Sequence, residues 1–134
     1  MAANGGDGTA SGGCLCGGVR YRVERPLRDV VFCHCTRCRR THGHFAAYTS
    51  CARDDLVLEE DRTLRWHELD ASRRGFCAEC GASVFWERDG RTTISVSAGT
   101  LDGPTGLRPT RHIFVADAGD YYEIADGLEQ RPAR

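Results

Sequence analysis

Three cysteines with the spacing C-x-C-x-x-C stand near the centre of the segment VVFCHCTRCRRTHGH. A turn after Cys35 would let the sulfur atoms of Cys33, Cys35 and Cys38 face one ion. Three thiolates hold zinc firmly and leave one position of its tetrahedron for another ligand, which is the arrangement of a catalytic zinc. Because a soft metal surrounded by sulfur suits a further thiolate, the cluster predicts activation of a thiol substrate as a nucleophile.

A fourth residue of the chain could instead close this cluster and make it a structural site. His34 is the weakest candidate, because it lies between two ligating cysteines and should point the other way. His42, His44 and Cys51 follow Cys38 at separations that the chain can bridge. The residues therefore leave three alternatives: an open site, a site closed by one of these side chains, or a cluster without metal.

A second constellation joins the C-x-C pair of GCLCGG to the C-x-x-C-G pair of FCAECGA. In an extended segment residues i and i+2 point to the same side, so the first pair can chelate one ion while Leu15 points away. In the second pair the backbone curls around one metal, and Gly81 permits the tight turn. Together they predict a closed structural zinc site, whose binding free energy of roughly 10 kcal/mol or more is also folding free energy. Its four ligands would be Cys14, Cys16, Cys77 and Cys80.

The composition is that of one globular domain of 134 residues, with 40% hydrophobic residues and a net charge of −1. That charge gives no general attraction to nucleic acid or anionic membranes. No apolar run approaches the roughly 20 residues of a membrane span, and the N-terminus lacks the pattern of a secretory signal. We therefore expect a cytoplasmic protein, in which the eight cysteines are metal ligands rather than disulfides. All 18 positively charged residues are arginines, which we interpret first as a compositional bias.

Strands are the elements expected to position these ligands. Strict alternation over residues 19–24 predicts a strand with Val19, Tyr21 and Val23 on one face. Residues 83–99 predict a hairpin in which Asp89 and Gly90 supply the positive backbone angles of the turn. Further strands are predicted at 29–33, 44–50, 56–60, 63–68 and 111–116, with short helical turns after residues 35 and 53. The predicted fold is mainly β, with a flexible lead over residues 1–12, one zinc domain over 13–128 and a loose tail over 129–134.

Five motifs in this order resemble the glutathione-dependent formaldehyde-activating enzyme family, whose domain also occurs in centromere protein V. They are GGCLCGGVRY, CHCTRCRRTHG, RGFCAECGASVFW, SAGTLDGP and RPTRHIFV. The resemblance implies a mainly β, tent-like fold related to Mss4, with two zinc ions per chain. It assigns the structural zinc to Cys14, Cys16, Cys77 and Cys80, and the catalytic zinc to Cys33, Cys35 and Cys38. It also implies a carbon–sulfur lyase that condenses formaldehyde with glutathione to S-hydroxymethylglutathione.

Substrate contacts are expected from the arginines that flank the central cluster. Arg37, Arg39 and Arg40 could clamp the carboxylates of glutathione through bidentate pairs, or could form a solvated charged turn. The expected partners are a small thiol, glutathione or an analogue, and a small aldehyde; we expect no membrane and no nucleic acid, and the sequence leaves the oligomeric state open. Two other functions compete with this one: a non-catalytic zinc module with a closed central site and a basic surface, and a redox or metal-storage protein whose cysteines form disulfides.

Overall fold

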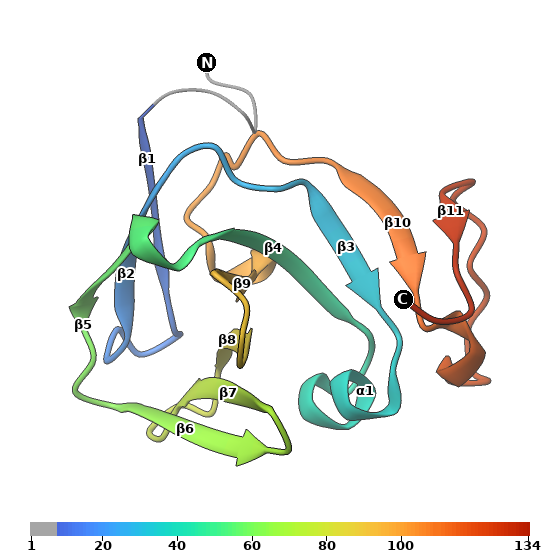
Figure 1. Ribbon diagram of the computed structural model, residues 1–134, viewed down its shortest axis with the longest axis horizontal. Helices are drawn as coiled ribbons and strands as arrows, with labels where there is room; N and C mark the ends of the chain where they lie inside the picture. The colour runs from blue at the N-terminus through green and yellow to red at the C-terminus, as the bar shows by residue number, and fades with distance from the viewer. Residues whose placement is uncertain (1–7) are drawn as a thin grey trace.

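A computed structural model describes residues 8–134 and shows a mainly β fold, as the sequence predicts (Figure 1). One of its two sheets is small and antiparallel, with the strand order β1-β2-β5. Its strands are β1 (Thr9–Gly13), β2 (Arg20–Glu24) and β5 (Leu56–Glu60). Within residues 8–134, no helix has the length and apolar character that crossing a membrane requires.

The larger sheet curves across the molecule from β6 at one edge to β11 at the other (Figure 1). Its order is β11-β10-β3-β4-β9-β8-β7-β6, and only β10 pairs in parallel, with β3 and β11. Its strands are β3 (Val30–Cys33), β4 (Ala46–Ala52), β6 (Leu64–Leu69), β7 (Ser72–Cys77), β8 (Ser83–Arg88), β9 (Thr93–Ser97), β10 (Pro109–Ile113) and β11 (Glu129–Gln130). Neither sheet is closed into a barrel by the strands that the structure describes.

Helical structure is confined to short pieces between strands. The α-helix α1 (Thr36–His42) follows Cys35, and the 3₁₀ turn η1 (Arg53–Asp55) begins at Arg53, so both predicted helical turns are confirmed. Two further 3₁₀ turns are η2 (Ala98–Thr100) and η3 (Val115–Asp117). The fold therefore positions its functional side chains on strand ends and on one short helix.

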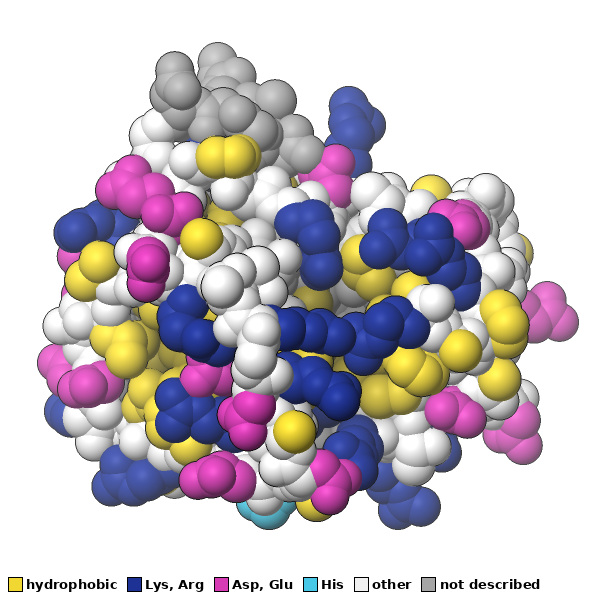
Figure 2. Space-filling view, viewed as in Figure 1, with side chains coloured by type: hydrophobic (Ala, Val, Ile, Leu, Met, Phe, Trp, Pro, Cys, Tyr) yellow, Lys and Arg dark blue, Asp and Glu magenta, His cyan; other side chains and the backbone are white. Residues whose placement is uncertain are grey.

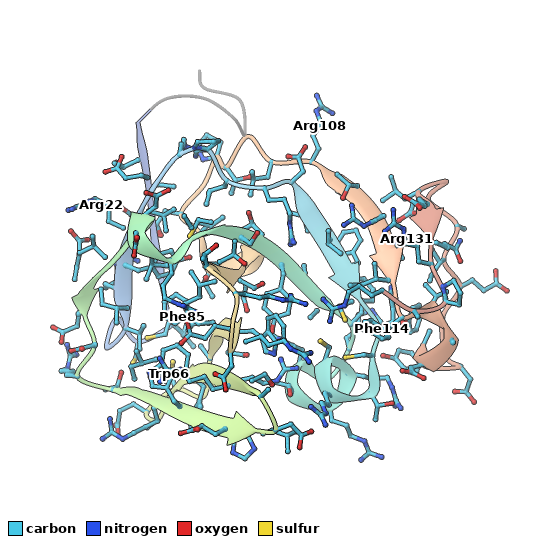
Figure 3. The ribbon with its side chains drawn as sticks, viewed as in Figure 1. Arg22, Trp66, Phe85, Arg108, Phe114 and Arg131 are labelled. Atoms are coloured by element: carbon cyan, nitrogen blue, oxygen red, sulfur yellow. The ribbon has the colours of Figure 1, made fainter. Side chains whose placement is uncertain are left out.

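Two hydrophobic clusters form the core of the molecule. The first contains Val19, Tyr21 and Val23, all fully buried, which confirms the predicted alternation. In it the rings of Tyr21 and Phe85 meet edge to face at 5.4 Å. The second surrounds the central cysteines and includes Phe114. Figure 3 shows Phe85 and Phe114 on opposite sides of the molecule. Each cysteine constellation thus has its own apolar surroundings.

The β8–β9 hairpin is present, but its turn differs in detail from the prediction. Gly90 has φ +81°, whereas Asp89 is not among the residues with positive φ. The neighbouring β6–β7 hairpin uses Asp70 instead, with φ +55°. Strand β7 itself was not among the predicted strands, although it carries Cys77 at its end.

Residues 9–12 and 129–134 are more ordered than the sequence suggests. Residues 9–12 belong to β1, which pairs with β2, so the flexible lead predicted over 1–12 is wrong for this part; residues 1–7 lie outside the described range. The loose tail predicted over 129–134 is also corrected. Gln130 pairs with His112, and the Phe114 amide donates to the Ala133 carbonyl at 2.9 Å. Backbone hydrogen bonding, which carries little side-chain pattern, explains both errors.

Candidate metal centres and the adjoining pocket

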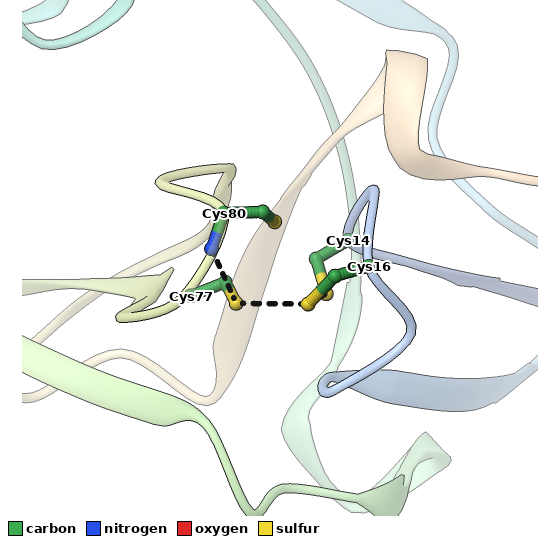
Figure 4. A group of neighbouring side chains, drawn as sticks. All are labelled: Cys14, Cys16, Cys77 and Cys80. Carbon is green, nitrogen blue, oxygen red and sulfur yellow. Dashed lines mark hydrogen bonds between the residues drawn. The ribbon is translucent and has the colours of Figure 1, made fainter.

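Four cysteines, two from the loop after β1 and two from the end of β7 and the turn after it, lie close together (Figure 4). The sulfur of Cys16 lies 3.7 Å from that of Cys14 and 3.6 Å from that of Cys77. A tetrahedral zinc with bonds of about 2.3 Å requires sulfur–sulfur edges of about 3.8 Å. All four sulfur atoms, including that of Cys80, lie within 4.8 Å of one another. The donor set and its spacing therefore fit zinc.

Backbone amides point at these sulfur atoms, as they do at thiolates that bind metal. The amide of Val19 donates to Cys14 at 3.2 Å, and that of Cys80 donates to Cys77 at 3.3 Å. The Cys80 amide, followed by the Thr63 hydroxyl, lowers the pKa of Cys77 to about 6. The surroundings thus favour the ionised form of Cys77, which is the form that ligates a metal.

The local backbone follows the predicted geometry at the second cysteine pair and differs from it at the first. Gly81 has φ +80° and lies directly after Cys80, where its amide closes the turn by donating to the Cys77 carbonyl at 2.8 Å. Leu15 is 90% exposed, as expected, but the chain bends at Leu15 and Cys16 instead of running extended. A bend on one side and a tight turn on the other therefore deliver the two cysteine pairs.

Gly18→Ala is expected to destabilise this centre, because a Cβ at Gly18 would lie 2.1 Å from Oγ1 of Thr63. Thr63 is itself held close to Cys77, at 3.1 Å. We expect unfolding free energy to fall by about 1–3 kcal/mol, the usual cost of overpacking, in urea denaturation of the zinc-loaded protein. Gly99→Ala is the control, because no atom lies within 4 Å of its added Cβ. Equal stability of the two variants would contradict this contact.

The central cluster is built where β3 ends and α1 begins. Cys33 is the last residue of β3, Cys35 caps the helix in an extended conformation, and Cys38 returns within the first helical turn. The amide of Cys38 donates to the sulfur of Cys35 at 3.3 Å. Gly43, with φ +77°, ends the helix. All three sulfur atoms lie within 4.8 Å of one another, so this donor set also fits a soft metal ion.

The structure places each residue that was considered as a fourth ligand away from the three sulfur atoms of the central cluster. His42 contacts the hydroxyl of Tyr48 at 3.0 Å, and His44 contacts the hydroxyl of Tyr121. His34 points away from the cluster, and Cys51 lies in the other hydrophobic cluster. Within residues 8–134, the metal-ligating group at this point has three members, all cysteines. This geometry leaves one tetrahedral position for a ligand from outside the chain.

A cavity of about 400 Å³ opens directly beside the central cluster. Its walls combine aromatic and aliphatic side chains with the three cysteines, and the aromatic ones are Tyr48, Trp86 and Phe114. Trp86 faces the cavity while its neighbour Phe85 is fully buried in the other cluster, because consecutive residues of a strand point to opposite faces. A ligand in this cavity would have one end at the three sulfur atoms.

The arginines that line the cavity are mostly not those that the sequence singled out. Arg37 lines it and forms an exposed salt bridge with Asp70 at 2.5 Å. Arg39 and Arg40, on the same helix, are not among the lining residues. Sequence reasoning missed the other five, because strand pairing brings them together from distant segments. They are Arg28, Arg74, Arg88, Arg91 and Arg134.

Arg74, Tyr48 and His42 form a polar network at the cluster's edge. Arg74 donates from Nη1 to the Tyr48 hydroxyl at 2.9 Å and from Nη2 to the sulfur of Cys38 at 3.7 Å. Burial, followed by the positive charge of Arg74, lowers the pKa of His42 to about 4, so this imidazole is neutral near pH 7. Burial also raises the pKa of Tyr48 above its usual range, which keeps the phenol protonated. The network therefore places the neutral phenol of Tyr48 and the permanent positive charge of Arg74 beside the central cluster.

A second polar chain lies behind the cluster and does not line the cavity. His34 Nε2 is 2.8 Å from His112 Nδ1, and His112 Nε2 is 2.8 Å from a carboxylate oxygen of Asp126. The other ring nitrogen of His34 contacts the Tyr122 hydroxyl. His34 and His112 are both buried. These hydrogen bonds hold the segment around residues 122–126 against β10 and the residue that follows β3.

Comparison with known proteins gives three matches. The family model described as "Glutathione-dependent formaldehyde-activating enzyme" matches residues 9–117. A Halomonas elongata protein named "Putative glutathione-dependent formaldehyde-activating enzyme" is 32% identical over 133 residues, which covers 90% of this chain and 83% of that protein. A crystal structure of a Rhodobacter sphaeroides protein has a TM-score of 0.61 at 25% identity, and covers 74% of this chain and 97% of that one.

Proposed function

The chain belongs to the glutathione-dependent formaldehyde-activating enzyme family, and we propose that it is a zinc-dependent enzyme that adds a small thiol, glutathione or an analogue, to formaldehyde or another small aldehyde. The observation that carries this proposal is the cluster of three cysteines beside a cavity of about 400 Å³. The reverse reaction would cleave a carbon–sulfur bond, which would make the enzyme a carbon–sulfur lyase.

The side chains around the cavity suit both the activation of the thiol and the binding of the rest of the thiol compound. Zinc bound by Cys33, Cys35 and Cys38 would supply a Lewis acid that lowers the pKa of a thiol in its fourth position. Arg74 lies at the same edge, and its guanidinium offsets negative charge that gathers at the reacting sulfur. The face of Trp86 and the cavity's arginines would hold the rest of the thiol compound and limit its orientation.

The proposed addition needs one proton donor. The thiol sulfur forms a bond to the carbonyl carbon, the carbonyl π bond breaks, and the carbonyl oxygen takes up a proton while the thiol gives up its own. Tyr48 is the donor that the geometry favours, because it lines the cavity and its oxygen already accepts a hydrogen bond from Arg74. Arg74 would stabilise the phenolate that is left, and solvent would return its proton.

Tyr48→Phe is therefore expected to lower kcat by about 100-fold, a typical contribution of general acid catalysis, with a smaller change in KM. The measurement is the rate of S-hydroxymethyl product formation above the uncatalysed rate, followed by NMR, with zinc content determined in parallel. Tyr121→Phe is the matched control, since Tyr121 is exposed and does not line the cavity. A Tyr48→Phe enzyme with full zinc and wild-type kcat would rule out Tyr48 as the donor.

Zinc X-ray absorption with and without glutathione tests the proposed function itself. We expect added glutathione to change the signal of the central zinc, by replacing a light-atom ligand with a sulfur at about 2.3 Å. The zinc at the four-cysteine centre should not change, because its ligand set is complete. A spectrum that is unaffected by thiol, together with no acceleration of product formation, would contradict the proposal.

A further inference from the structure

Ion pairing among the arginines of this chain is uneven. Away from the cavity, six of the twelve arginines pair with carboxylates at distances from 2.6 to 3.2 Å: Arg20 with Asp102, Arg22 with Glu59, Arg53 and Arg73 with Glu87, Arg62 with Glu60, and Arg131 with Glu129. Of the six arginines that line the cavity, only Arg37 forms a salt bridge among the residues that the structure describes. A compositional bias accounts for arginine in place of lysine, but it does not account for this gathering of unpaired charge.

The unpaired arginines extend from the cysteines to the far rim of the cavity. Arg74 is at the cysteine end, 3.7 Å from Cys38. Arg88 and Arg91 come from the end of β8 and the turn after it, and Arg134 approaches them from the C-terminal segment. Figure 2 shows positively charged side chains gathered over the middle of this face. Positive charge therefore lines the cavity both beside the cysteines and at Arg88, Arg91 and Arg134.

Mutual repulsion among these side chains indicates that they are placed for an anion. Burial, followed by the charges of Arg134 and Arg88, lowers the pKa of Arg91. Asp117 is the one acidic residue among those lining the cavity. Glutathione carries two carboxylates and one ammonium group, so its net charge of about −1 near pH 7 leaves most of this positive charge unbalanced. A phosphate, with a charge of about −2 and three acceptor oxygens, matches the planar guanidinium donors better.

We propose that the thiol compound of this enzyme carries a phosphate group, which binds at Arg88 and Arg91 while its sulfur lies at Cys33, Cys35 and Cys38. The inference rests on the proposed function, because it takes the reactive group of the ligand to be a thiol. Trp86 lines the same cavity, with the Arg91 guanidinium 5.6 Å from the centre of its ring, and would contact the linking portion of the ligand.

Pantetheine and 4′-phosphopantetheine provide the test, because they share one thiol arm and differ by a single phosphate. We expect the zinc-loaded protein to bind the phosphorylated compound at least about tenfold more tightly in calorimetric titrations at low ionic strength, as charge-assisted hydrogen bonds imply. The preference should weaken as salt is added. Equal dissociation constants for the two compounds would overturn the proposal.

Variants test whether Arg88 and Arg91 cause the preference for 4′-phosphopantetheine over pantetheine. In Arg88→Gln/Arg91→Gln, the ratio of the two dissociation constants should fall to about one. Arg62→Gln is the matched control, since Arg62 pairs with Glu60 and does not line the cavity, and it should keep the wild-type ratio. A double variant that retains the full preference would overturn the assignment. So would inorganic phosphate binding as tightly as 4′-phosphopantetheine, because the thiol arm would then contribute nothing.

The formaldehyde assay separates a failure of this inference from a failure of the proposed function. If glutathione is turned over and the phosphate gives no preference in binding, the proposed function stands and the phosphorylated thiol is excluded. If 4′-phosphopantetheine binds preferentially but no thiol accelerates formaldehyde addition, the ligand class stands and the proposed reaction is excluded.

Discussion

Cys77→Ser is expected to unfold the domain. Cys77 ends β7 and lies 3.6 Å from the sulfur of Cys16, so its thiolate joins a strand of the large sheet to the N-terminal loop. Structural zinc contributes roughly 10 kcal/mol or more to folding, whereas a whole domain has a net stability of only about 5–15 kcal/mol. Losing one ligand of this centre therefore removes most of the domain's net stability. Far-UV circular dichroism and thermal denaturation of the purified variant measure the effect.

Cys35→Ser is the control for this experiment, because it removes one ligand of the central cluster and leaves the four-cysteine centre complete. We expect Cys35→Ser to keep a cooperative thermal transition and Cys77→Ser to lose it. Adding a strong chelator to the wild type should reproduce the unfolding, and adding zinc should reverse it. A Cys77→Ser protein with the wild-type transition would show that the fold is stable without this metal.

The second large effect is expected on activity rather than stability. Cys35→Ala should reduce product formation to the uncatalysed rate, because two thiolates no longer hold the central ion firmly. Zinc content should fall from about two ions per chain to about one. Cys35 also caps α1 by accepting from the Cys38 amide at 3.3 Å. Loss of such a cap costs only about 1 kcal/mol, so the variant should remain folded.

The control for this variant is Cys51→Ala, because Cys51 is a buried cysteine that belongs to neither candidate metal group. We expect it to be less stable, as a truncated core residue is, but to keep two zinc ions and its activity. A Cys35→Ala protein that retains both zinc ions and wild-type activity would exclude the central cluster as the reaction site.

Short-range spacing made the cysteine groups predictable from the sequence. The Cys33/Cys35 pair lies in extended backbone, where alternate residues share a side, and the orientation of His34 follows from the same rule. The close spacing of Cys14 and Cys16 also brings their sulfur atoms together, although the chain bends there. The burial of Tyr21 was likewise visible in the alternation of residues 19–24. These features depend on neighbours only a few residues away.

Long-range pairing explains what the sequence did not reveal. Arg74 lies in β7, which pairs between β6 and β8 and is far in the sequence from α1, yet the folded sheet brings its guanidinium within 3.7 Å of the Cys38 sulfur. Strand β1, with the sequence TASGG, has no apolar alternation and is held by backbone pairing with β2. The arginines of the cavity come from five separate segments, so no local motif marks them as a group.

The strand order also bears on when each centre can form during protein synthesis. All four ligands of the four-cysteine centre exist once the chain has been made as far as Cys80. Strand β3, which carries Cys33, lies between β4 and β10, and its partner β10 begins only at Pro109. Because the N-terminal part of a chain leaves the ribosome first, the four cysteines of the structural centre would be available to bind zinc before β10 has been made. The supporting strand of the reactive centre would arrive last, when the rest of the fold can already shield it.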